Sequence, residues 1–251
     1  MNLKYRADID GLRAIAVLSV VLDHAGIPLF HGGYIGVDIF FVISGYLITG
    51  IIIREINASE FSFLRFYERR IRRIYPALFV VILFTILASA TLYSTGNFHD
   101  FGKSVMATTF FVSNIHFWTE TGYFEGPAQI KPLLHTWSLA VEEQFYIVFP
   151  LLMFLLARYF KPRIRPILIF IALASFVWSI FTLQKDPSSA FYFAHLRAWE
   201  LLMGVLCNET LCLTVIDKQP LYEDDSHLSV FGSEYVAHIY NQVFRELVNV
   251  K

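Results

Sequence analysis

Charge is scarce in this sequence of 251 residues: 16% are Asp, Glu, Lys or Arg, against about 25% in a typical soluble domain, while 56% are hydrophobic. The net charge is −1 and no basic arm interleaves with aromatic residues, so nothing points to nucleic-acid binding. Two cysteines cannot form a disulfide framework, and the eight histidines lack the spacing of metal ligands, so we expect no metal site. The charged start shows no cleavable signal peptide. A composition this poor in charge and rich in hydrophobic residues is typical of a membrane protein.

Six apolar segments approach the 20 or so residues that a helix needs to cross a bilayer. They are residues 12–30, 34–53, 74–93, 137–157, 166–183 and the shorter 196–206. Lysines and arginines gather before the first segment, after the second and between the fourth and fifth, which places the N-terminus and these loops in the cytoplasm. A span at 104–118 would put the last of these loops outside, so we expect 94–136 to be external, with 104–118 re-entrant or interfacial; a full span there is the alternative. The predicted fold class is all-α, a polytopic membrane helix bundle of about six spans.

Composition changes abruptly near residue 206. Residues 207–251 are polar, contain a turn signal at 218–220 and predict a helix over 233–249. We therefore divide the chain into a transmembrane domain, 1–206, and a short soluble tail, 207–251, which is too short to build a core of its own.

Ionisable residues stand inside the apolar segments. Asp23 and His24 lie in the first segment, and Arg13 precedes His24 by eleven residues, roughly 16 Å along one helix face. A charge in hydrocarbon costs at least about 2.5 kcal/mol, so such residues usually face a polar cavity and act there. A histidine can abstract a hydroxyl proton and an aspartate can orient it. The alternative is a helix–helix hydrogen bond or an interfacial Asp–His pair.

A basic run, RFYERRIRRIYP, covers residues 65–76. Arg69 and Arg72 lie three residues apart, as do Arg70 and Arg73, so on a helix each pair shares a face and could grip a phosphate group. The alternative is ordinary positive-inside anchoring.

Paired carboxylates follow in LLHTWSLAVEEQFYIVFP, residues 133–150, where Glu142 and Glu143 enter an apolar helix one to two turns after His135. Two adjacent carboxylates cannot both face lipid, so at least one should point into the bundle; an interfacial position is the alternative. Further along, Arg197 and Glu200 stand at i, i+3 and predict a structural ion pair.

Five stretches together resemble membrane acyltransferase family 3, which contains bacterial O-antigen and peptidoglycan O-acetylases. They are YRADIDGLRAIAVLSVVLDHAG, GGYIGVDIFFVISGYLIT, FYERRIRRIYPAL, KPLLHTWSLAVEEQFYIVFPLL and RAWELLMG, in order over roughly residues 5–206. The resemblance implies a multi-pass enzyme of the bacterial inner membrane. It would move an acyl group, expected to be acetyl, from cytoplasmic acyl-CoA to a hydroxyl of a cell-envelope polysaccharide or glycolipid.

The resemblance also gives residues roles. His24 is the base or acyl relay, with Arg13 and Asp23 beside it, and Glu142 orients the acceptor or binds protons. The basic run binds the CoA phosphates through Arg69, Arg72 and Arg73. Residues expected to line the substrate cavity are Asp38, Ser44, Tyr46, Trp137 and Ser138.

The tail resembles the last segment of an SGNH-type esterase or acyltransferase domain, with Asp224 and His227 as its Asp–His pair. No Gly-Asp-Ser nucleophile block accompanies that pair. The chain therefore looks like the front and back ends of a longer protein, joined near 206. Two other interpretations stay open: a catalytically inactive remnant or non-catalytic membrane module, and a small transporter, although the inverted repeats typical of transporters do not appear.

Overall fold

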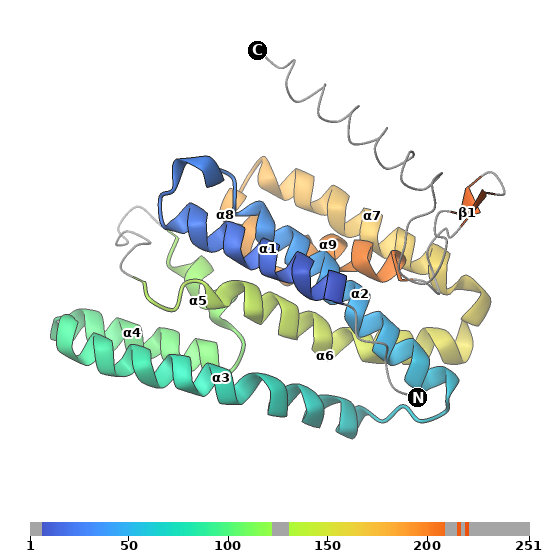
Figure 1. Ribbon diagram of the computed structural model, residues 1–251, viewed down its shortest axis with the longest axis horizontal. Coiled ribbons are helices and arrows are strands. Elements are labelled where there is room, and N and C mark those ends of the chain that lie inside the picture. Colours follow the sequence, from blue (N-terminus) through green and yellow to red (C-terminus); the bar gives the residue numbers. More distant parts are fainter. Residues whose placement is uncertain (1–6, 122–130, 209–214, 217–218, 221–251) are drawn as a thin grey trace, which may run out of the picture.

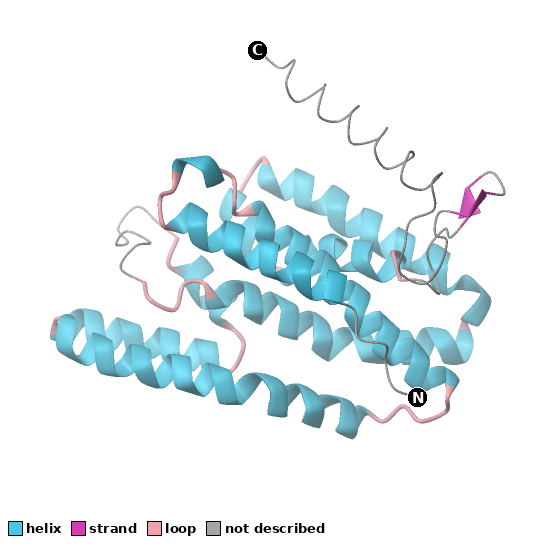
Figure 2. Ribbon diagram, viewed as in Figure 1, coloured by secondary structure: helices cyan, strands magenta, loops and turns pink. Residues whose placement is uncertain are grey.

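The computed structural model describes residues 7–121, 131–208, 215–216 and 219–220, and nearly all of them are helix or the loops between helices (Figures 1 and 2). In chain order the elements are α1 (Ala7–His24), η1 (Pro28–Phe30), α2 (Ile35–Asn57), α3 (Phe63–Leu92), α4 (Thr95–Thr109), α5 (Ser113–Thr119), α6 (Thr136–Tyr159), η3 (Lys161–Arg163), α7 (Ile164–Leu183), α8 (Pro187–Tyr192), α9 (Ala194–Leu206), β1 (Val215–Ile216) and β2 (Gln219–Pro220). The predicted helix bundle is confirmed.

Four of the described helical segments are long and apolar enough to cross a membrane: Ile35–Asn57, Phe63–Leu92, Thr136–Tyr159 and Lys161–Leu183. The first and last of the six predicted spans differ. Helix α1 has 18 residues, but four of them are charged, and it ends at His24 rather than at residue 30 because Gly26 takes a left-handed φ of 72° and Pro28 follows. Helix α9 has 13 residues, a length of about 20 Å, which is short of a hydrocarbon core.

Helix α9 occupies the middle of the bundle, where it packs on α2 and α7, while α1 lies on the outer side of α2 (Figure 1). Two glycines bring α2 and α9 together: a Cβ at Gly45 would overlap the carbonyl oxygen of Leu201, and one at Gly204 would overlap that of Val42. Small residues allow this close backbone approach in membrane helices.

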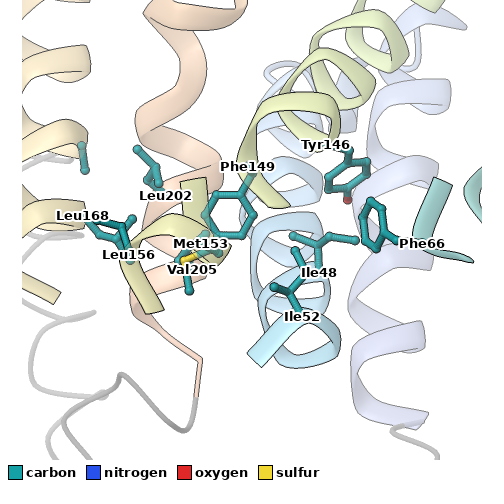
Figure 3. Close-up of a cluster of buried hydrophobic side chains, with 11 residues drawn as sticks. Ile48, Ile52, Phe66, Tyr146, Phe149, Met153, Leu156, Leu168, Leu202 and Val205 are labelled. Atoms are coloured by element: carbon teal, nitrogen blue, oxygen red, sulfur yellow. The ribbon is translucent and has the colours of Figure 1, made fainter. Parts of the chain in front are cut away.

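The main apolar core joins α2, α3, α6, α7 and α9 (Figure 3). The labelled side chains around it are Ile48, Ile52, Phe66, Tyr146, Phe149, Met153, Leu156, Leu168, Leu202 and Val205. In contrast, α1, α3 and α7 expose many large apolar side chains, such as Phe84 at 73% and Phe170 at 72%. Such outward apolar faces are expected of helices that contact lipid.

Residues 95–119 form the helices α4 and α5, and the re-entrant or interfacial position predicted for 104–118 stays a prediction. Helix α4 runs back along the second half of α3 (Figure 1), and the turn after it carries Phe111 at a φ of 54°. The Tyr75 hydroxyl donates to the Thr109 carbonyl at 3.0 Å, and Gln144 Nε2 donates to the Phe111 carbonyl at 2.9 Å. Helix α5 then leads back toward the start of α6, where Ser113 donates to the Thr136 carbonyl at 2.9 Å. The turn therefore reaches well along α3 and α6.

In the tail, β1 and β2 pair antiparallel. The helix predicted over 233–249 and the predicted pair Asp224 and His227 lie outside the described residues.

Candidate functional site

The helix directions give the bundle two chemically different ends (Figure 1). One, here called the His24 end, holds the last residue of α1, the starts of α2, α6 and α9, and α8. The other, the basic end, holds the end of α2 and the start of α3, where the arginine run lies. From Ile35 to Glu55 helix α2 rises about 30 Å, close to the thickness of a hydrocarbon core.

Between the two ends lies a buried hydrogen-bonded cluster on Glu142. Its Oε1 accepts from Ser44 Oγ at 2.5 Å and from the Tyr146 hydroxyl at 2.8 Å. The same Tyr146 hydroxyl lies 3.3 Å from the Ser44 carbonyl oxygen. Glu142 is 7% exposed and Ser44 4%. The structure thus brings together two residues predicted separately, Ser44 on α2 and Glu142 on α6, and adds Tyr146, which the sequence did not single out for this role.

Glu143 is also buried, and it forms an ion pair with Arg70. Arg70 Nη2 lies 2.5 Å from Glu143 Oε1, and its guanidinium carbon lies 4.0 Å from the centre of the Tyr146 ring. Arg70 therefore contacts both Glu143 and the tyrosine that binds Glu142. The prediction that at least one of these carboxylates turns into the bundle is confirmed, since both do.

The arginines predicted to bind phosphates remain on the outside of α3. Arg69 pairs with Glu55 at 2.7 Å and Arg72 with Glu68 at 2.8 Å, with side chains 50% and 78% exposed. Arg73 is also exposed. Exposed ion pairs of this kind contribute about 0–1 kcal/mol, so a polyanion can displace the carboxylates at little cost.

Arg13, Asp23 and His24 share α1 but have separate surroundings. Arg13 lies 3.9 Å from Asp10 and 5.3 Å from the ring centre of Phe40. His24 is exposed, and its Nδ1 lies 2.8 Å from the carbonyl oxygen of Val20. Because a carbonyl only accepts, Nδ1 donates in this bond, and the neutral ring keeps its lone pair on Nε2. In that tautomer Nε2 is the ring nitrogen that can accept a proton. Asp23 is half-buried.

A second ionic cluster occupies the His24 end. Arg197 contacts Asp38 of α2, and its Nη2 lies 2.9 Å from Glu200 Oε2. Its guanidinium carbon lies 5.3 Å from the Trp137 ring centre and 5.5 Å from that of Phe191. The predicted pair of Arg197 and Glu200 is confirmed, and Asp38 and Trp137, predicted as cavity lining, meet at the same arginine.

The remaining predicted lining residues lie apart from this cluster. The Ser138 hydroxyl donates to the His135 carbonyl at 3.1 Å, and the Tyr46 carbonyl accepts from Asn208 at 3.1 Å, toward the far end of α9. His135 stands just before α6. Desolvation by its surroundings lowers the pKa of the His135 ring, the Pro132 backbone opposes this, and the charge of His24 lowers the pKa further. The two histidines are therefore electrostatic neighbours at the His24 end.

Comparison with known proteins decides the family. The family model of the acyltransferase domain, acyltransferase 3, matches residues 6–209. The chain belongs to the acyltransferase 3 family. A second model, the SGNH domain that is fused to such domains, matches residues 201–242. The resemblance predicted from the five motifs and from the tail is confirmed, and with the apolar helices it indicates a bacterial membrane protein.

Two relatives illustrate the match. The chain is 37% identical over 207 residues to the peptidoglycan O-acetyltransferase OatA of Listeria monocytogenes, which covers 80% of this chain and 33% of OatA. It is 42% identical over 176 residues to an uncharacterized protein of Haemophilus influenzae, covering 67% of this chain and 72% of that protein. The chain thus spans about a third of the length of OatA. No solved structure matches.

Proposed function

We propose that this chain is the membrane part of an O-acyltransferase that moves an acyl group from cytoplasmic acyl-CoA to a hydroxyl of a cell-envelope polysaccharide. One observation carries the proposal: in a member of this family, an exposed arginine run and an exposed histidine base stand at opposite ends of a bundle about one bilayer long. Substrates on opposite sides of a membrane require this separation.

The donor binds at the basic end. Coenzyme A carries phosphate groups, and Arg69, Arg72 and Arg73 present guanidinium groups on the exposed side of α3. Guanidinium groups bind phosphates through paired, charge-assisted hydrogen bonds. The density of lysine and arginine at this end supports a cytoplasmic position, where acyl-CoA is found.

The phosphates of the donor stay at the basic end while its acyl end enters the bundle toward His24, which performs the chemistry at the other end. In one route Nε2 takes the proton of the acceptor hydroxyl while the hydroxyl oxygen attacks the thioester carbonyl carbon; the C–S bond breaks and the CoA thiolate leaves and takes up a proton. In the other route Nε2 attacks the thioester carbonyl carbon first, and the C–S bond breaks so that the CoA thiolate leaves and takes up a proton. In a second step the acceptor hydroxyl attacks the acyl-imidazole; the N–C bond to the acyl group breaks, and the hydroxyl proton returns to the ring or to water. Both routes use the Nε2 lone pair that the bond to Val20 leaves available.

Glu142 assists from within the bundle, either as a proton-binding group or by orienting the acceptor. The hydroxyl groups of Ser44 and Tyr146 both donate to its Oε1 and so fix the carboxyl group. For the acceptor we favour peptidoglycan over O-antigen, because the named relative, OatA, is a peptidoglycan O-acetyltransferase.

The test is a sided transfer assay. The chain is reconstituted in vesicles, and protease access to the basic end determines its orientation. Radiolabelled acetyl-CoA is then supplied on the side of the basic end only, with solubilised peptidoglycan on the other side. Labelled ester on the glycan, with equal release of free CoA thiol, supports the proposal. No ester and no thiol from a folded protein would overturn it.

A further inference from the structure

We infer that the acceptor glycan binds at the His24 end against the accessible side chains of Asp38 and Phe191, which the buried side chains of Arg197 and Trp137 support. This inference rests on the proposed function, because it gives the acceptor of that reaction a site.

The four side chains come from four helices that meet at this end. Arg197 on α9 contacts Asp38 on α2, and its guanidinium carbon lies 5.3 Å and 5.5 Å from the ring centres of Trp137 on α6 and Phe191 on α8. The Trp137 and Phe191 rings lie 4.3 Å apart, centre to centre. Two of the four side chains are buried: Trp137 is 8% exposed and Arg197 is 9% exposed. The other two are accessible: the Asp38 side chain is 41% exposed and Phe191 43%.

Charge selects the kind of ligand. Asp38 and Glu200 both pair with Arg197, so the guanidinium group of Arg197 already has carboxylate partners. A phosphate-bearing donor would have to displace them here, whereas the exposed arginines at the opposite end are more open to it. Hydroxyl groups instead donate to a carboxylate, and such charge-assisted bonds are among the strongest hydrogen bonds in proteins.

The aromatic rings add the second half of carbohydrate recognition. A sugar ring has an apolar face of C–H groups that packs on an aromatic ring, while its hydroxyls bond to a neighbouring carboxylate. Arg197 contacts both the Asp38 carboxylate and the Phe191 ring, and Trp137 packs on the same ring. An accessible ring and an accessible carboxylate thus share one arginine at the end of the bundle that carries His24.

The test compares two variants with two matched controls, all in the full chain held in lipid nanodiscs. Phe191→Ala removes the accessible ring and Asp38→Asn removes the accessible charge. The controls are Phe98→Ala, at a ring on α4 that is 39% exposed, and Asp100→Asn, at an exposed aspartate that pairs with Lys103 at 2.8 Å. Calorimetric titration with chitotetraose, a neutral amino-sugar glycan, measures binding, and the transfer assay measures KM for acceptor and donor separately.

We expect Phe191→Ala to weaken chitotetraose binding about twofold to tenfold and Asp38→Asn about fivefold. The acceptor KM should rise by the same factors, while the donor KM and both controls stay unchanged. Glycan binding that depends on Phe191 in a chain without transfer activity would uphold this site and refute the proposed function. Transfer with an unchanged acceptor KM in both variants would uphold the proposed function and refute this site. Equal losses in Phe191→Ala and Phe98→Ala would mean adsorption to any exposed ring and would overturn the site.

Discussion

The buried ion pair between Arg70 and Glu143 should be the most sensitive contact of α3 with the rest of the bundle. Their side chains are 16% and 9% exposed, and the joining distance is 2.5 Å. Replacing Arg70 by Met keeps an extended apolar side chain but leaves Glu143 buried without its cation. Removing one partner of a buried pair costs about 3–5 kcal/mol. The lost cation–π contact with Tyr146 adds about 0.5–2 kcal/mol.

Two comparisons separate this effect from a general loss of arginine. Arg69→Met is the matched control: it removes the neighbouring arginine, whose pair with Glu55 is half-exposed and worth about 0–1 kcal/mol. The double variant Arg70→Met with Glu143→Met removes both charges, and replacing a buried pair by apolar residues is close to neutral. It should therefore recover most of the stability.

Thermal unfolding in detergent, followed by circular dichroism, measures the difference. In a chain of this size each kcal/mol shifts the midpoint by about 2–4 °C, so Arg70→Met should lower it by about 7–28 °C and Arg69→Met by less than about 4 °C. A double variant as unstable as Arg70→Met, or equal shifts in the two single variants, would refute the reasoning.

Three further predictions concern other parts of the bundle. Glu142→Gln keeps one oxygen acceptor for the two hydroxyls, so the unfolding midpoint should stay within a few degrees while transfer falls about a hundredfold or more; a full transfer rate would exclude a proton-binding role. The pKa of His135 is lowered in the folded chain, so the unfolded chain binds more protons, and stability should fall as the pH drops from about 6.5 through that lowered pKa. His135→Gln should flatten a pH series of unfolding midpoints across this window, and an unchanged slope would contradict the assignment. Gly45→Ala should prevent stable folding, because its Cβ overlaps a backbone carbonyl of α9, whereas Gly102→Ala meets open space; equal midpoints for the two would contradict the α2–α9 contact.

Features set by local patterns could be predicted from the sequence. The apolar segments predicted the long helices, and the i, i+3 spacing of Arg197 and Glu200 predicted their ion pair. The end of α1 was predicted too late, because apolar residues continue through the Gly26 turn to Phe30, and mean hydropathy does not register a left-handed glycine.

Contacts between distant segments were harder to predict. Five arginines occupy the first three turns of α3, and the one that turns inward, Arg70, contacts Glu143 and Tyr146, more than 70 residues away. Likewise, Asp38 and Arg197 are 159 residues apart, and their contact depends on the close packing of α2 on α9 at Gly45 and Gly204. A pattern within one segment of the sequence does not identify partners in a distant segment, although two buried carboxylates do imply a cation nearby.

The most direct test of the proposed function is the sided transfer rate of His24→Ala. His31→Ala is the matched control, since His31 is an exposed histidine in the loop that follows α1 at the same end of the bundle. The account predicts that His24→Ala lowers ester formation by at least about a hundredfold, while His31→Ala keeps the parent rate. Ester formation by His24→Ala at the parent rate would contradict it.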